Sequence, residues 1–553
     1  VAQDLEPEYI ATNNTTAYVA CQENNAFAIV DINTATVTDI VALGTKDHSL
    51  PGNEIDPSDR DSGINIANWP VKGFYMPDAI ASFEINGQTY IVSANEGDGR
   101  DYDAFSDEDR VKDLTLDPMA FPDAATLQED ENLGRLTVST ADGISEAKAF
   151  SADFSGNQEV PAVTTEASGS GSLRLSEDGT VLSYEFTISG LDFGVLAGGE
   201  AQTIDEGDDV IMMHIHNADR GSNGGVVFGI LMPSQDGDDF QVVINEDGSA
   251  TVSGAWEEAD ESNQALSDFV EALRNASEGD DLALYFNIHT NRVRSGEVRA
   301  QIVAGAPLYN EIFSFGSRSF TIWDATGNLV YDSGAELEQI TAAAFPADFN
   351  ANNDENDSFE SRSDNKGPEP EGVVTGVING RTYSFLGLER IGGITVHDVT
   401  DPTAPKFIQY INNRDFSVAD VEADLEAAGD LGPEGLVFIS AEDSPNGQSL
   451  LVVTNEVSGS VSVYGIDVPA EPFTLQLLHA SDLEGGVEAI SNAPNFAAIT
   501  DALEERVDNT VIISGGDNYI PGPFFNAAAD RSIRDLLQDV YQDFFNEPGL
   551  SNL

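Results

Sequence analysis

One pattern recurs along this 553-residue chain: an acidic residue, an apolar strand, an Asn-Gly pair, a second apolar strand and another acidic residue. It runs from Glu371 to Glu389 and returns from Asp78 to Glu96 and from Glu434 to Glu456. A weaker copy, without a proline and acid at its start, ends at Glu23. An Asn-Gly pair between apolar runs predicts a tight hairpin, because both central residues of a type I′ turn need positive φ.

A recurring hairpin with recurring acids predicts a repeat fold. Small antiparallel sheets repeated around an axis form a β-propeller, and acids at equivalent strand ends would then converge on one mouth of its channel. At about 45 residues per blade, the roughly 310 residues on either side of a central insert give about seven blades. The alternative is that each Pro-Glu-Gly marks only a turn.

Composition narrows the class of protein and of partner. Short Val, Ile, Phe and Tyr runs between Gly, Asn and Asp clusters predict a mainly β chain. The net charge is −73, with 97 acidic and 24 basic residues, so nucleic acid and anionic membranes are excluded as expected partners. Two compatible explanations remain: solubility in high salt, and binding of divalent cations, above all Ca²⁺.

The single cysteine, Cys21, rules out an internal disulfide framework, and its apolar strand predicts a small buried residue. No apolar run reaches the length needed to span a membrane.

Acidic, glycine-rich turns are the first calcium candidates, because Ca²⁺ prefers carboxylate and carbonyl oxygens. One turn follows Asn95, a second lies in residues 350–364, and the acids at the starts of the repeats form a third group; each of the two turns could equally be a solvated loop. The calcium candidates are Glu96, Asp98, Asp101, Asp103, Asp354, Asp357, Asp364, Glu369, Glu371 and Glu434.

Four segments, residues 93–102, 315–324, 364–372 and 388–393, resemble the choice-of-anchor I proteins. These are secreted bacterial β-propellers that are also similar to a mesenchymal cell-surface glycoprotein. The resemblance implies a propeller in two pieces and an extracellular or cell-surface location.

The insert between the two pieces, residues 146–304, resembles a CHRD (chordin-type) domain at residues 150–161, 213–217, 287–290 and 296–302, which implies a β-sandwich-like domain. His214 and His216 lie two apart, so in a strand they point to the same face. Together with His289 they are a candidate Zn or Cu site. The alternative is that all three hydrogen-bond inside the domain and bind nothing.

The pattern changes after a linker at residues 469–472. An apolar strand at residues 473–478, a helix at 495–506 and a strand at 510–513 predict an α/β unit, with ligands beyond the carboxyl ends of the strands. The segment resembles the start of a calcineurin-like metallophosphoesterase of the 5′-nucleotidase type. The resemblance implies a two-metal site for Zn, Mn or Fe on Asp482, Glu484, Asp517 and Asn518. Glu484 stands where the family has a histidine, and the family's later histidine motifs are absent, so we expect this domain to be incomplete.

The sequence therefore predicts four segments: propeller at residues 1–145, insert at 146–304, propeller at 305–468 and the start of a phosphoesterase-like domain at 469–553. The leading functional hypothesis is an extracellular calcium-binding propeller within a larger secreted phosphatase or nucleotidase that acts on a phosphate ester. The alternative is a self-assembling subunit of a surface layer, filament or adhesive appendage. A third hypothesis places a calcium-clamped phosphate ester on the repeated acids Asp78, Glu96, Glu371, Glu389, Glu434 and Glu456.

Overall fold

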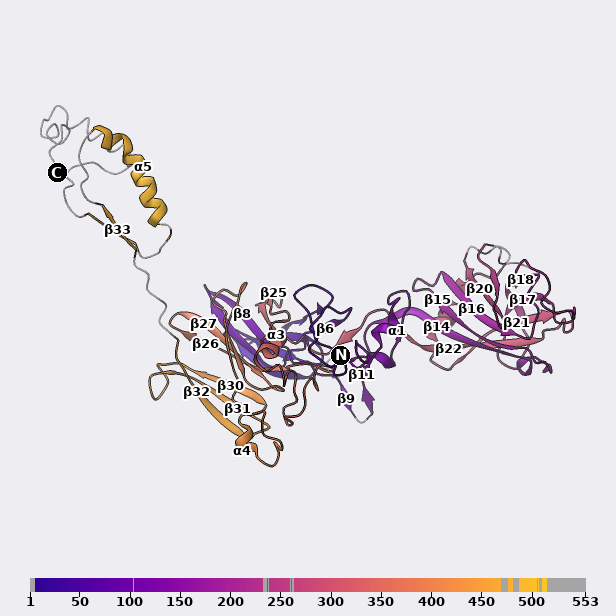
Figure 1. Cartoon of the computed structure of the whole chain (residues 1–553), viewed down its shortest axis with the longest axis horizontal. Coiled ribbons are helices and arrows are strands. Elements are labelled where there is room, and N and C mark those ends of the chain that lie inside the picture. The colour runs from indigo at the N-terminus through magenta and orange to yellow at the C-terminus, as the bar shows by residue number, and fades with distance from the viewer. Residues whose placement is uncertain are drawn as a thin grey trace. The chain divides into compact units, whose positions relative to one another are not determined.

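The computed structural model describes residues 5–102, 104–231, 236, 238–258, 260, 263–468, 476–480, 487–504, 506 and 510–514. The chain divides into two compact units, Val1–Ile466 and Asp467–Leu553. Strands dominate the first unit, which confirms the mainly β class (Figure 1).

Four sheets of the first unit are antiparallel meanders, in which each strand pairs with the next one along the sheet. The first comprises β1 (Pro7–Thr12), β2 (Thr16–Cys21), β3 (Ala26–Asp31) and β4 (Thr36–Ala42). The second comprises β7 (Ile80–Ile85), β8 (Gln88–Ala94), β24 (Phe320–Asp324) and β25 (Leu329–Asp332). The third comprises β26 (Pro370–Ile378), β27 (Arg381–Leu388), β28 (Ile394–Asp398) and β29 (Lys406–Ile411). The fourth comprises β30 (Pro433–Ile439), β31 (Ser449–Asn455) and β32 (Ser460–Ile466).

The first strands of the four meanders contact one another in series, β1 with β7, β7 with β26, and β26 with β30. Apolar side chains fill the space between neighbouring meanders. Trp323 of the second meander packs edge-on against Phe27 of the first, and Phe320 shares a buried cluster with Val373 and Leu386 of the third. The predicted seven blades are not confirmed.

Two of the three Asn-Gly hairpins fold as predicted. Asn86-Gly87 and Asn379-Gly380 are two-residue turns with positive φ at both positions. In the third, Gly447 has a positive φ of 73° but belongs to a longer loop between β30 and β31, so a type I′ turn was the wrong prediction there. Cys21 is buried and free, as expected.

A five-stranded sheet completes this part of the unit and surrounds a small core that includes Leu133, Leu136 and Val138. Its strands, in sheet order, are β11 (Glu108–Arg110), β13 (Thr137–Ser139), β23 (Phe313–Ser314), β6 (Lys72–Phe74) and β5 (Thr45–Asp47). A ribbon of β9 (Asp101–Tyr102) and β10 (Phe105–Ser106) and the helices α1 (Ala124–Leu127), α3 (Glu336–Ala344) and α4 (Leu425–Ala428) lie in the connections. The short helix α4 ends at Gly429, which has a positive φ of 83°.

Residues 144–309 contain most of one ten-stranded curled sheet, labelled in Figure 1. Its path is β18 (Gly225–Leu231), β17 (Val210–Asn217), β21 (Asp281–Thr290), β22 (Val298–Tyr309), β14 (Ile144–Ser155), β15 (Ser168–Leu175), β16 (Val181–Ser189), β20 (Ala250–Glu257) and β19 (Gln241–Ile244). β12 (Thr115–Leu116) pairs with β22, and α2 (Ser267–Asn275) follows β20.

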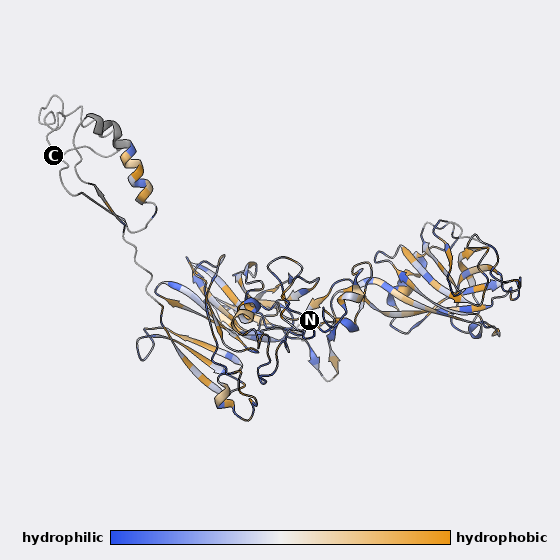
Figure 2. Cartoon of the chain, in the orientation of Figure 1, coloured by the Kyte–Doolittle hydropathy of each residue, from blue (hydrophilic) through white to orange (hydrophobic). Residues whose placement is uncertain are grey.

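The strands of this sheet alternate in hydropathy, as β16 shows by burying every second residue from Leu182 to Ile188 (Figure 2). The buried residues form one large core that includes Phe186, Phe286 and Trp256. A sandwich of two sheets was expected here. The structure has one curled sheet, because β14 and β22, the first and last long strands of the segment, pair with each other.

In the second unit, β33 (Gln476–Ala480) and β34 (Thr510–Ser514) pair in parallel, and α5 (Val487–Glu504) connects them along the chain. The predicted strand–helix–strand order is therefore confirmed. No helix among the described residues is long and apolar enough to cross a membrane.

Candidate functional site

In three of the four meanders the first strand begins with a proline followed by an acid, and in the second meander Pro77 and Asp78 stand just before β7. We call Glu8, Asp78, Glu371 and Glu434 the first-strand acids. In three meanders the first strand contains one residue more than the strand paired with it over the same stretch. In the first meander, Pro7 pairs with Cys21 and Ile10 pairs with Val19, so three residues on one strand match two on the other. The same register shift follows Pro370 and Pro433. This extra residue is a β-bulge, which bends a strand and redirects its side chains. The second meander has the same hydrogen-bond pattern, in which two successive residues lie opposite one residue of the partner strand. The Asp78 N–H donates to the Ala94 carbonyl oxygen, and the Ala94 N–H donates to the carbonyl oxygen of Ala79.

The residue before the proline has a left-handed backbone in three of the four meanders. The φ angles are 43° at Met76, 49° at Glu369 and 67° at Gly432. Only glycine adopts this region without strain, so Met76 and Glu369 hold a conformation that the surrounding structure must stabilise. Each of these three meanders thus has a left-handed residue before the proline and a bulge at the first-strand acid, and the backbone is strained in two of them, at Met76 and Glu369.

The first-strand acids interact across the four meanders. Burial, the charges of Glu96 and Glu8 and the interaction with the Glu8 side chain raise the pKa of Asp78 to about 8. Burial, then Glu389, Glu96, Asp78 and Glu434, raises the pKa of Glu371 to about 10. Asp78, Glu371 and Glu434, which were predicted to converge, therefore lie near enough for their charges to act on one another.

Tyr9, directly after Glu8, reports the same convergence. Burial raises the pKa of its hydroxyl to about 12, and the charges of Asp78, Glu434, Glu371 and Glu8 act in the same direction. The phenol therefore lies close to carboxylates from all four meanders.

A second group of carboxylates adjoins the first-strand acids. Oxygens of Glu96, Glu369 and Glu389 lie within 4.8 Å of one another. Lys366 Nζ is 3.1 Å from Glu96 and 3.6 Å from Glu369, and Arg390 Nε is 2.8 Å from Glu369 and 3.1 Å from Glu389. These bases hold this group together by charge.

Glu369 is the centre of the second group. It is fully buried, and burial alone would raise its pKa, but Lys366, Arg362 and Arg390 outweigh that effect and lower it. Burial and the charge of Glu369 raise the pKa of Glu389 to about 8.

The two groups differ in their charge balance. Among the described residues, no Lys or Arg forms an ion pair with a first-strand acid, whereas Glu96, Glu369 and Glu389 each have one. Moreover, Glu371 Oε2 is buried and accepts no hydrogen bond from the described residues, and Asp78 is only 9% exposed. The uncompensated negative charge therefore lies at the first-strand acids.

The other predicted calcium residues lie in different environments. Asp98 is half exposed and 3.6 Å from Lys366, Asp101 is exposed in β9, and Asp103 lies outside the described residues. Glu456 is exposed and lies against Gly432. The structure thus does not bring the turn after Asn95 together as one carboxylate group.

The loop at residues 350–364 is divided. Asp354 and Asp357 line a cleft of about 530 Å³ with Asp420 and Glu422. Asp364 is instead paired with Arg110 at 3.0 Å and with Arg135 at 2.7 Å, which favours a role in holding the loop.

The phosphoesterase-like candidates Asp482, Glu484, Asp517 and Asn518 lie outside the described residues. The three histidines of the insert do come together: ring nitrogens of His214, His216 and His289 lie within 4.8 Å of one another.

The sequence analysis missed Glu8, Tyr9 and the bases Lys366 and Arg390. The prediction that the copy ending at Glu23 lacks a proline and acid at its start was wrong, because Pro7-Glu8 repeats the Pro-acid start of the other copies. This start was overlooked because the first meander has no Asn-Gly hairpin. The bases stand beside predicted acids in a chain with only 24 basic residues, which is a weaker signal.

The choice-of-anchor I domain matches residues 1–153 and 202–402. The chain belongs to the choice-of-anchor I family. Two relatives of this choice-of-anchor I protein are Gigasin-3a of Magallana gigas, 30% identical over 172 residues, and the mesenchyme-specific cell surface glycoprotein of Strongylocentrotus purpuratus, 32% identical over 104 residues. These alignments cover 29% and 16% of this chain.

The aligned part of the chain spans 61% of Gigasin-3a and 13% of the sea-urchin glycoprotein. A solved structure, hydrazine synthase of Kuenenia stuttgartiensis, matches across 84% of this chain and 96% of that chain at 11% identity. Its TM-score of 0.12 is too low to inform the fold. The CHRD and phosphoesterase resemblances stay predictions.

Proposed function

We propose that this choice-of-anchor I protein is an extracellular or cell-surface scaffold that binds Ca²⁺ at the first-strand acids. Membership of the family supports the surface location, as does a relative named as a cell surface glycoprotein. The four meanders are blades of a β-propeller in this proposal, with their first strands around a common axis.

The observation that best supports calcium binding is the uncompensated group of Glu8, Asp78, Glu371 and Glu434. Four carboxylates from four separate sheets repel one another at neutral pH unless protons or a cation neutralise them. Ca²⁺ accepts six to eight oxygens in flexible geometry, which suits side chains from different sheets. Burial and neighbouring carboxylates raise the pKa of Asp78 and of Glu371, so a cation at this position would stabilise the ionised form of both.

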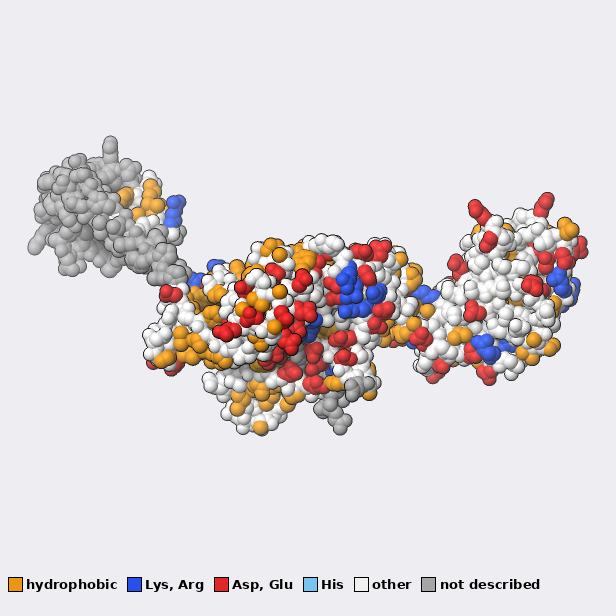
Figure 3. All heavy atoms as spheres, turned by 60° about the horizontal axis from the view of Figure 1, so that its bottom comes forward, with side chains coloured by type: hydrophobic (Ala, Val, Ile, Leu, Met, Phe, Trp, Pro, Cys, Tyr) orange, Lys and Arg blue, Asp and Glu red, His pale blue; other side chains and the backbone are white. Residues whose placement is uncertain are grey.

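The surface charge agrees with this proposal. On the face shown in Figure 3, acidic side chains are widespread among the described residues and basic ones form only a few small groups. A protein of this charge would be stabilised by screening and by bound divalent cations in a salt-rich exterior.

The test is calcium binding to the chelator-treated chain, measured by isothermal titration with Mg²⁺ at equal ionic strength as the comparison. We expect Ca²⁺ to bind and to raise the melting temperature. In an Asp78→Asn, Glu371→Gln double variant the affinity should fall at least tenfold, because half of the first-strand carboxylates lose their charge.

The matched control is Glu84→Gln, which removes an exposed carboxylate from β7, the strand that Asp78 precedes. It should bind Ca²⁺ as the unmodified chain does. Equal affinity in the double variant and in this control would refute the site, and equal stabilisation by Mg²⁺ would reduce the effect to screening.

The predicted phosphatase or nucleotidase activity remains a second proposal. It is supported only by the parallel pair of β33 and β34 that α5 connects, an arrangement on which phosphate-ester chemistry is common. Assembly into a surface layer or appendage remains the alternative role for the same scaffold.

A further inference from the structure

The three histidines of the insert lie on one face of the ten-stranded sheet. β17 and β21 are antiparallel neighbours, in which Met212 pairs with His289 and His214 with Asn287. Paired residues of neighbouring strands share a face, and so do residues two apart. His214, His216 and His289 therefore point to the same side, opposite the apolar core that contains Ile215 and Ile288.

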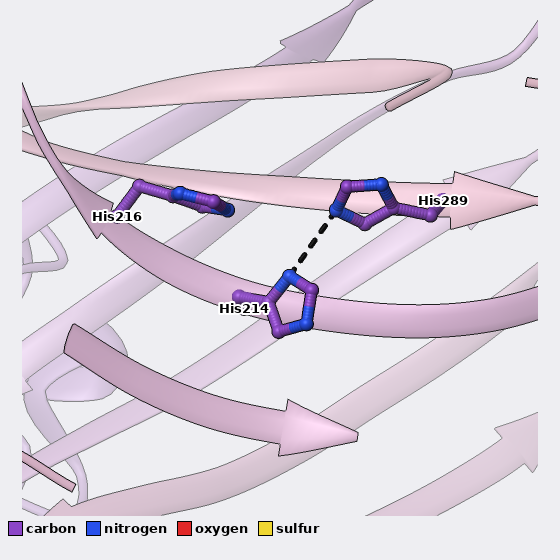
Figure 4. A group of neighbouring side chains, drawn as sticks. All are labelled: His214, His216 and His289. Carbon is purple, nitrogen blue, oxygen red and sulfur yellow. Dashed lines mark hydrogen bonds between the residues drawn. The ribbon is translucent and has the colours of Figure 1, made fainter. Parts of the chain in front are cut away.

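The three rings face one another (Figure 4). The Nδ1 of His214 lies 3.1 Å from the Nε2 of His289, and one nitrogen of each ring lies within 4.8 Å of the others. Ligand nitrogens around a tetrahedral zinc ion at 2.0–2.1 Å are separated by about 3.3 Å. Small rotations of the rings would bring all three nitrogens to that separation.

Backbone contacts orient two of the rings for ligation. The Nδ1 of His216 is 3.1 Å from the carbonyl oxygen of Gly224, and the Nδ1 of His289 is 3.1 Å from that of Arg294. A carbonyl only accepts, so each Nδ1 holds the proton and each Nε2 presents a lone pair. This outer hydrogen bond is the usual support of a metal-binding histidine.

Burial favours the neutral form of His216 and His289, and an aromatic neighbour holds the His216 ring in place. Burial lowers the pKa of His216 and of His289, and the positive charge of Arg299 lowers that of His216 further. The Tyr285 ring stacks on His216 with 4.9 Å between centroids and also contacts the Arg299 guanidinium. Neutral imidazole is the form that binds a metal.

Hydrogen bonding inside the domain explains only part of this arrangement. It accounts for one contact between the rings, that of His214 with His289. The Nε2 of His216 is buried and makes no hydrogen bond to the described residues. A buried polar atom without a partner is costly, which points to a ligand at that nitrogen.

We propose that His214, His216 and His289 form a binding site for one Cu²⁺ or Zn²⁺ ion. Three imidazoles without thiolate suit these ions, and they do not suit Ca²⁺, which prefers oxygen. The site is separate from the first-strand acids in residues and in chemistry, so either proposal can fail alone.

The test uses the full chain, stripped of metal and held in excess CaCl₂ so that carboxylate sites are occupied. CuSO₄ and ZnCl₂ are added separately, and bound metal is counted by mass spectrometry after gel filtration. We expect one tightly bound equivalent of metal per chain. Electron paramagnetic resonance of the copper form should show coupling to three imidazole nitrogens. Competition between the two ions then identifies the preferred metal.

Variants locate the site. His216→Gln and His289→Gln should each lower affinity at least tenfold and abolish the rise in melting temperature on adding metal. The matched control is His397→Gln, which removes a buried histidine of β28 and should bind as the unmodified chain does.

Three results would overturn the proposal: unchanged affinity in both site variants, an equal loss in the His397 control, or a copper spectrum with oxygen ligands only. The spectrum of the unmodified chain decides the matter even where a variant fails to fold.

Discussion

Two glutamates two positions apart, Glu369 and Glu371, show how neighbours change the consequence of the same residue type. Glu369 is fully buried and bound by Arg362, Lys366 and Arg390, whereas Glu371 has acids as its neighbours. The sequence named both as calcium candidates. It could not distinguish them, because the distinction depends on side chains that come together only in the fold.

The same substitution at these two positions should have opposite effects. Glu369→Gln removes the buried carboxylate that Arg362, Lys366 and Arg390 share, and should lower the free energy of unfolding by about 3–5 kcal/mol. Glu371→Gln removes repulsion and should leave the calcium-free chain equally or more stable. Urea unfolding in chelator measures both changes. A loss of stability of similar size in the two variants would contradict this account.

At the scale of elements, tight turns could be predicted from the residues that form them, whereas the pairing of strands far apart in the sequence could not. Asn86-Gly87 and Asn379-Gly380 were predictable because turn chemistry is encoded in the two residues themselves. The pairing of β8 with β24, which closes the second meander, joins Ala94 to Phe320 across the whole insert. The bulges at the first-strand acids were not predictable either, because register depends on both strands.

Gly87 allows a direct test of the turn chemistry. Its φ is 78°, and a Cβ there would meet no atom within 4 Å, so any cost of a side chain is conformational. Gly87→Ala should lower the free energy of unfolding by about 1–2 kcal/mol. Gly225→Ala is the control, since Gly225 also has open space but no positive φ. Urea titrations in which both variants lose the same stability would show that the left-handed turn is not the cause.

At the scale of the whole molecule, two sources of repulsion act in the same direction. One is the net charge of −73, spread over the surface; the other is the cluster of carboxylates that includes the buried Asp78 and Glu389 and the half-buried Glu371. Composition revealed the first, and the recurring acids indicated the second. Added salt distinguishes the two sources of repulsion. In 1 M salt the screening length for exposed charges falls to about 3 Å, whereas repulsion between buried charges is screened far less.

The stability of the calcium-free chain should therefore fall as pH rises, even in 1 M NaCl. The folded-state pKa values of Asp78 and Glu389 are about 8 and that of Glu371 is about 10, all above the ordinary values near 4. Between about pH 4 and these values, the unfolded chain has lost protons that the folded chain retains. Each retained proton lowers the free energy of unfolding by up to about 1.4 kcal/mol per pH unit.

Urea unfolding from pH 5 to pH 9 measures this slope. In 1 M NaCl the slope should persist in the unmodified chain and become shallower in Glu371→Gln, which has lost one of the titrating groups. Saturating Ca²⁺ should flatten it further, because the cation replaces the protons and binds more tightly as they leave. A slope that 1 M NaCl abolishes in both proteins would assign the whole effect to the exposed charges. The first-strand acids would then have no part in it.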